Sequence, residues 1–325
     1  MNLPELLALT LVAVLSGMAF LIFWLDRYRA EPVPRLALMA LWGFLCPLLF
    51  RLADPNLGFV GDFDPILGPA AALPVAAGLL EELLLAAGLT LIATSHYLDG
   101  PVDGAVYGAV AGLGFACFQG LGALHAGWAP PHAALPAYAT LVRAGATAAV
   151  GAGIGLAKLT ARPLVRVPCA LAAVLVAGVA RWVLYGAAGY GWGVWGVRNT
   201  PFNLALVAAA ALLLAGVLVG AFAVEHRVLA RQLGEEVQLG VVPGWVVDVL
   251  PSYRRRIRSD WWTRRDERRE IVRLLTALAF RKHQLRGISG TRARLYGLEV
   301  GRLRQRSRTL LALASAADTP EGGAT

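Results

Sequence analysis

The chain has 325 residues, of which 57% are hydrophobic and 16% are charged, and its formal net charge is +9. Soluble globular domains carry about 25% charged residues, so this composition excludes an ordinary soluble protein and indicates a membrane protein. The three cysteines lie in apolar runs without a CxxC pair, which excludes a disulfide framework.

Seven apolar stretches are candidates for helices that cross a bilayer, which takes about 20 apolar residues. They are residues 4–24, 35–50, 66–93, 103–125, 134–158, 167–188 and 201–224. The first has an acidic start and no small-residue cleavage site, so it is predicted to be a retained helix rather than a removed signal peptide. Trp192 and Trp195 are predicted to lie in a Gly-rich loop before the last stretch, at the membrane interface.

Basic residues predict the orientation, because they are enriched in cytoplasmic loops. The loops after the first and fifth stretches carry Arg27, Arg29, Arg35, Lys158, Arg162 and Arg166. The loops on the opposite side carry only Arg51 and Arg198. This bias puts the N-terminus outside and the C-terminal tail in the cytoplasm.

Charge divides the chain near residue 225. Residues 1–224 carry ten basic and ten acidic side chains, whereas residues 225–325 carry twenty and eleven. The sequence therefore predicts an all-α membrane bundle of about seven spans over residues 1–224 and a small, basic cytoplasmic helical tail over residues 225–325. In the tail, residues 225–238 continue the last span, and residues 262–286 and 291–316 form amphipathic helices that can pair as a hairpin. Residues 317–325 are predicted to be disordered.

A dense basic and aromatic segment precedes the first of these amphipathic helices and continues into its first turns. It includes Arg254, Arg255, Arg256, Arg258, Trp261, Trp262, Arg264, Arg265, Arg268 and Arg269. Because the segment is tethered at a membrane, its predicted partner is anionic lipid headgroups and not nucleic acid. A solvated helix face and a protein partner remain the alternatives.

Glu81 and Glu82 lie side by side inside the third apolar stretch. A carboxylate at membrane depth costs at least about 2.5–3.5 kcal/mol, so such a pair calls for compensation or a function. Charge compensation predicts that the two glutamates face Arg143 and Arg181 of later spans. The alternative is a catalytic centre.

The same region carries further polar and small residues. Gln119 is four residues after Phe115 on one helix face, and Thr147 lies in the fifth stretch. A lone buried glutamine is typical of a helix–helix hydrogen bond, and a threonine commonly bonds back to its own helix. Glycines at 104, 108 and 112, and again at 151 and 155, predict that the third to fifth stretches pack closely.

Two segments carry a family resemblance. The run DGAVYGAVAGLGFA over residues 103–116 and the run WLDRYRAEP over residues 24–32 closely resemble the PrsW family of bacterial intramembrane proteases, related to the CAAX-type prenyl proteases. The resemblance covers roughly residues 20–160. It implies a helical fold in a bacterial inner membrane, proteolysis with a metal invoked near carboxylates and histidines, and Glu81 and Glu82 as candidate catalytic residues.

Several positions of the chain differ from the family pattern. Leu85 stands where the family has lysine, Gln119 where it has glutamate, and Thr147 where it has histidine. A later histidine is also missing, where the chain reads Ala180-Arg181-Trp182. No cofactor is evident, and a divalent metal is expected only if the protein is active, because a hydrolytic metal takes about three protein ligands.

Adjacent helical residues point about 100° apart, so Glu81 and Glu82 are not expected to bind one ion readily or to share one pocket. The first hypothesis is a degenerate family member that binds or regulates membrane-protein partners, either substrates or clients. The second is an active protease that uses Glu81 and Glu82. The third is a small-solute or proton carrier, although the inverted repeats typical of carriers are not obvious.

Overall fold

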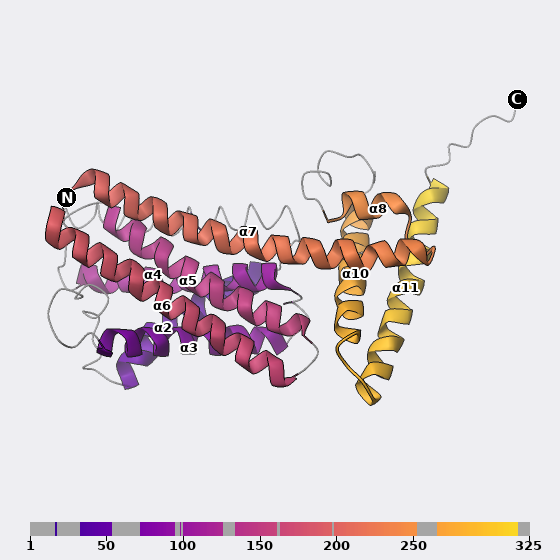
Figure 1. Ribbon diagram of the computed structural model, residues 1–325, viewed down its shortest axis with the longest axis horizontal. Helices are drawn as coiled ribbons and strands as arrows, with labels where there is room; N and C mark the ends of the chain where they lie inside the picture. Colours follow the sequence, from indigo (N-terminus) through magenta and orange to yellow (C-terminus); the bar gives the residue numbers. More distant parts are fainter. Residues whose placement is uncertain are drawn as a thin grey trace, which may run out of the picture. The chain divides into compact units, whose positions relative to one another are not determined.

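The computed structural model describes residues 17, 33–53, 72–94, 98, 100–125, 134–160, 163–196, 198–251 and 265–317. Over these residues the regular structure is helical, without strands (Figure 1). The helices are α2 (Val33–Ala53), α3 (Ala72–Thr94), α4 (Pro101–His125), α5 (Ala134–Leu159), α6 (Pro163–Trp195), α7 (Thr200–Gln238), α8 (Gly244–Val249), α10 (Arg265–Leu285) and α11 (Thr291–Ala317).

The chain divides into two compact units. The first comprises residues 1–158 and 166–221, and the second comprises residues 159–165 and 222–325. Helix α7 is continuous through the division, so its N-terminal part belongs to the first unit and its last turns belong to the second.

Six of the seven predicted spans coincide with helices α2 to α7, and the first, residues 4–24, lies almost wholly outside the described residues. Four apolar segments in the described part of the chain are long enough to cross a membrane: Pro101–Leu121, Ala137–Leu159, Leu164–Trp195 and Thr200–Gln238. The apolar part of α2, Val33–Leu49, is shorter. The chain is an all-α integral membrane protein, while seven crossings and the cytoplasmic tail stay predictions.

The end of α6 differs from the sequence prediction. Trp192 and Trp195 lie in the helix, not in a loop, because α6 continues to Trp195. The indole of Trp192 donates a hydrogen bond to Asn203 Oδ1 at 2.9 Å, and the Trp195 and Phe202 rings are 4.9 Å apart. A Cβ on Gly191 would clash with the Phe202 ring. Gly191 thus makes room for a contact with α7 that offsets its low helix propensity.

Helices α4 and α5 approach through their glycines, as the spacing predicted. A Cβ added to Gly104 would meet the carbonyl oxygen of Gly151, and one added to Gly108 would meet that of Thr147. The same holds for Gly112, whose Cβ would lie 2.8 Å from the carbonyl oxygen of Arg143. Backbone contact of this kind is how helices pack in lipid, where dispersion and close approach replace hydrophobic driving force. It brings the polar face of α5 next to α4.

Replacing Gly108 by alanine is expected to lower the free energy of unfolding by about 1–3 kcal/mol, because the added methyl group must push apart two packed backbones. Thermal unfolding of the full chain in detergent micelles measures the change. Gly220→Ala is the matched control, since a Cβ at exposed Gly220 of α7 meets nothing within 4 Å. Equal melting temperatures for the two variants would contradict the close packing of α4 on α5.

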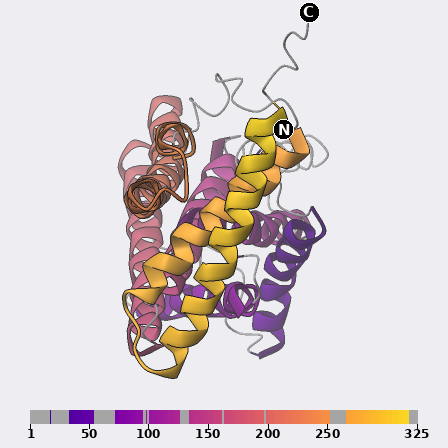
Figure 2. The same ribbon diagram turned by 90° about the vertical axis from the view of Figure 1, so that its right-hand side faces the viewer.

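The second unit contains the end of α7, α8 and a hairpin formed by α10 and α11 (Figure 2). The predicted helical extension to residue 238 and the predicted pairing of two amphipathic helices are confirmed. The apolar core of the second unit includes Leu233, Leu250, Leu275 and Leu278, all nearly inaccessible to solvent. The short helix α8, which the sequence did not predict, contributes Val246 to this core.

Several predictions about the tail lie outside what the structure describes. The basic segment falls there over residues 254–264, and so do residues 318–325. Arg265, Arg268 and Arg269 lie in α10, at positions where the structure describes the backbone alone.

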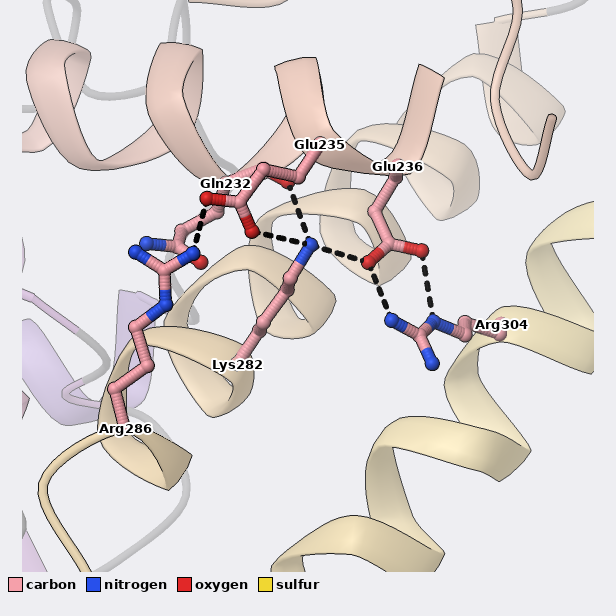
Figure 3. Close-up of polar contacts among 6 residues, drawn as sticks. All are labelled: Gln232, Glu235, Glu236, Lys282, Arg286 and Arg304. Carbon is pink, nitrogen blue, oxygen red and sulfur yellow. Dashed lines mark hydrogen bonds and ion pairs between the residues drawn. The ribbon is translucent and has the colours of Figure 1, made fainter. Parts of the chain in front are cut away.

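Ion pairs join the hairpin to the last turns of α7; Glu236 and Lys282 are buried at their centre, whereas Glu235, Arg286 and Arg304 are partly exposed (Figure 3). Lys282 of α10 lies 2.6 Å from Glu236 and 3.0 Å from Glu235. Arg304 of α11 donates two hydrogen bonds of 2.7 Å to the carboxylate of Glu236, and Arg286 donates one to Glu235. Glu236 is completely buried, so each of its oxygens depends on these cations instead of water.

Candidate functional site

The two adjacent glutamates lie near the middle of α3, with leucines on either side of them. Helix α3 is fixed against α2 by the indole of Trp42, which donates a hydrogen bond of 3.3 Å to the carbonyl oxygen of Leu84. Glu82 is fully buried, and the side chain of Glu81 is 14% exposed. Both carboxylates therefore lie within the bundle and away from bulk solvent.

Arg143 of α5 supplies the first positive charge. Its Nη1 atom lies 2.8 Å from Glu81 Oε2 and 3.7 Å from Glu82 Oε1. Its guanidinium also stacks on the ring of Phe115 of α4, 3.9 Å from the ring centroid, and no part of the side chain is exposed. Such a contact with an aromatic face stabilises a desolvated cation further.

Arg181 of α6 supplies the second positive charge. Its Nη1 atom lies 3.1 Å from Glu81 Oε2 and 3.1 Å from Glu82 Oε1. Gly78, one helical turn before the glutamates, makes room for it, because a Cβ there would clash with the guanidinium. We call Glu81, Glu82, Arg143 and Arg181 the four-charge cluster. With both acids ionised its formal charge is zero, which is what charge compensation predicted.

One expectation from the sequence is wrong. Glu81 and Glu82 were not expected to share one pocket, yet both reach the same nitrogen of Arg181. The expectation considered only the directions in which the side chains leave the helix. A glutamate has three rotatable side-chain bonds, so two carboxylates can start about 100° apart and still converge on one group.

The two replaced family positions lie beside this cluster. Thr147, one turn after Arg143, is buried, and its hydroxyl lies 3.0 Å from the carbonyl oxygen of Arg143 and 3.3 Å from Glu82 Oε2. The predicted bond of this threonine to its own helix is therefore present. Gln119 is partly buried on α4, one turn beyond the Phe115 ring that stacks on Arg143. The structure thus brings Glu81, Glu82 and Thr147 together, with Gln119 on an adjoining turn.

Sequence reasoning missed two residues of the site, Gly78 and Phe115, as supports for the arginines. The signal for Phe115 was its position four residues before Gln119, on the same face of α4. Nothing in the sequence marked Gly78, because its role depends on a guanidinium that arrives from a helix about a hundred residues later.

Around the four-charge cluster, the side chains that the structure describes do not fit a hydrolytic metal. Among the residues that the structure describes, no group of three or more His, Cys, Asp or Glu side chains could hold an ion. The carboxylates of the four-charge cluster already accept hydrogen bonds from Arg143 and Arg181. A divalent cation placed between them would lie beside two permanently charged guanidiniums, which would repel it.

A model of the PrsW family intramembrane metalloprotease matches residues 31–215, which is more than half of the chain. Searches of curated proteins and of solved structures found no match. The matched region includes all four members of the four-charge cluster together with Gln119 and Thr147. The resemblance seen in the sequence is therefore confirmed, and the chain belongs to the PrsW family of intramembrane metalloproteases.

Proposed function

We propose that this chain is a degenerate member of its family, which binds or regulates membrane-protein partners through the helical bundle and does not cleave them. The observation that carries the proposal is the four-charge cluster, in which Arg143 and Arg181 compensate the two glutamates. A carboxylate that acts in hydrolysis must either bind a metal or take a proton from water. Here one oxygen of each carboxylate, Glu81 Oε2 and Glu82 Oε1, faces guanidinium donors, and Glu82 Oε2 faces the hydroxyl of Thr147.

The replacements relative to the family pattern support the same proposal. Gln119 is neutral and a poor base, and the hydroxyl of Thr147 is a weak substitute for an imidazole as ligand or base. Leu85 is apolar and fully buried, so it brings no charge to the site. The bundle around these positions is kept, with glycine-mediated contact between α4 and α5, so the scaffold can still present its surface to other helices.

The proposed setting is the bacterial inner membrane, with the N-terminus outside and the tail in the cytoplasm. The distribution of basic residues supports this orientation. In this setting the proposed partners are other membrane proteins, which contact the bundle through the exposed leucine and valine side chains of α6 and α7.

The test compares new protein termini in the membrane fraction of cells that produce the chain, the Glu81→Gln/Glu82→Gln variant, or neither. We expect the same termini in all three samples, with changes only in the amounts of intact membrane proteins. The double variant is close in shape to the original chain and removes both carboxylates. Fragments that appear with the original chain and disappear with the double variant would show glutamate-dependent proteolysis and refute the proposal.

One observation favours an active protease as the second candidate. Glu81 and Glu82 meet in one pocket, as two carboxylates that share a proton must do. The two arginines oppose this candidate, because their guanidiniums contact Glu81 Oε2 and Glu82 Oε1, oxygens that two carboxylates would use to share a proton. The comparison of termini decides between the two candidates.

A further inference from the structure

The connection between α5 and α6 belongs to the second unit. Residues Leu159–Val165 lie in that unit, although the rest of both helices lies in the first. Leu159, the last residue of α5, is 3% exposed and belongs to the same apolar core as Leu233 and Leu278. Helix α6 begins at Pro163, so three residues separate it from α5. The second unit therefore holds the end of α5 and the start of α6.

These two helices carry both cations of the four-charge cluster. Arg143 is on α5 and Arg181 is on α6, whereas both glutamates are on α3, which lies wholly in the first unit. At 1.5 Å per residue, Arg143 is about 24 Å from Leu159 along α5, and Arg181 is about 27 Å from Pro163 along α6. The positions of the two guanidiniums thus depend on helices with one end in the second unit, and the positions of the carboxylates do not.

Helix α5 is suited to transmit a displacement from its last turn. Sharp bends in helices occur mostly at proline, and the segment from Arg143 to Leu159 contains none. Its glycines are packed on other helices: a Cβ on Gly151 or Gly155 would clash with the backbone before or within α4, and one on Gly153 would clash with Ala173 of α6. A displacement of the end of α5 is therefore passed along this helix and to α6, instead of being absorbed by a bend.

We propose that the four-charge cluster and the apolar core of the second unit are energetically coupled through α5 and α6. While the core holds Leu159, Arg143 and Arg181 stay in contact with the glutamates. A change that loosens the core displaces the two guanidiniums, and a change at the cluster loosens the core, because such coupling is reciprocal. The second unit thereby regulates the charged centre of the bundle, whether or not the bundle cleaves its partners.

The test changes the cluster from α3 and measures the second unit. Glu81→Gln/Glu82→Gln leaves Arg143 and Arg181 near each other without a counter-charge, and their repulsion acts on α5 and α6. Hydrogen exchange of the full chain in nanodiscs measures amide protection in α10, which contributes to the core. We expect protection to fall by about fivefold or more. Glu81→Gln alone keeps one carboxylate between the guanidiniums and serves if the double variant does not fold, with an expected fall of about twofold or more.

Two further variants identify the route. Gly88→Ala is also on α3, and its Cβ would clash with the Trp42 indole, so it loosens the bundle without touching the arginines. It is expected to change protection in α10 less than about twofold. Leu159→Ser removes the anchor and lowers protection by itself, and in its presence the glutamate substitutions are expected to add less than about twofold.

Three results would overturn the proposal. The first is unchanged protection in α10 when the folded chain carries the glutamate substitutions. The second is an equal loss with Gly88→Ala, which would mean that any loosening of the bundle reaches the second unit, for instance along α7. The third is a full effect of the glutamate substitutions in the Leu159→Ser background, which would exclude the end of α5 as the route.

Discussion

Replacing Arg143 by methionine is expected to lower the free energy of unfolding by about 3–5 kcal/mol, the usual result of removing one partner from a buried ion pair. The substitution keeps an apolar stem but leaves Glu81 and Glu82 with one guanidinium between them. Because Glu82 is fully buried and the side chain of Glu81 is only 14% exposed, water contributes little, and their repulsion is compensated only in part. Unfolding of the full chain in mixed micelles with increasing denaturing detergent measures the loss.

The control for this prediction is a second substitution that restores the charge balance of the four-charge cluster without restoring the arginine side chain. Arg143→Met combined with Glu81→Gln leaves one carboxylate facing one guanidinium, Glu82 with Arg181. We expect the double variant to regain most of the lost stability. If it stays as unstable as the single variant, the main contribution of Arg143 is its packing on Phe115 and not its charge.

The sequence predicted which residues form the four-charge cluster but not how their side chains are arranged. Two acids and two arginines inside apolar runs must compensate each other, because unpaired ions are too costly at membrane depth. That rule predicts which residues pair, but it does not predict the side-chain conformations that bring them into contact. The convergence of Glu81 and Glu82 depends on side-chain torsions, and the space for Arg181 depends on Gly78. Both are properties of the packed helices and not of any one segment.

For the fold as well, local sequence patterns predicted some helices, whereas others depend on tertiary packing. Long apolar runs predicted helices α2 to α7, because each run contains its own signal. The Gly-rich stretch with Trp192 and Trp195 was predicted to be a loop, since glycine disfavours helix, yet contacts with Asn203 and Phe202 outweigh that preference. Helix α8 is six residues long, too short for a periodic pattern, and is formed by packing on the core of the second unit.

In the second unit the largest effect is expected for Glu236→Gln. The glutamine keeps the shape of the side chain but removes the charge that Lys282 and Arg304 both approach. Lys282 is nearly buried and is then left with the charge of Glu235 and the carbonyl oxygen of Gln232, so we expect a loss of about 3–5 kcal/mol of local stability. Each 1.4 kcal/mol is about a tenfold change in equilibrium, which predicts that amide protection in α11 falls by about a hundredfold or more. Hydrogen exchange of the full chain, followed by mass spectrometry of its peptides, measures this.

The matched control is Glu299→Gln, which makes the same chemical change at an exposed ion pair of the same hairpin. The side chain of Glu299 is 45% exposed and that of its partner Arg281 is 23% exposed, so water replaces much of the lost interaction. Exposed pairs contribute about 0–1 kcal/mol, and the control is expected to change protection less than about fivefold. Similar losses for the two variants would mean that the hairpin is held by its apolar core alone. A selective loss for Glu236→Gln would show that burial, and not the number of ion pairs, decides which charges hold the hairpin to α7.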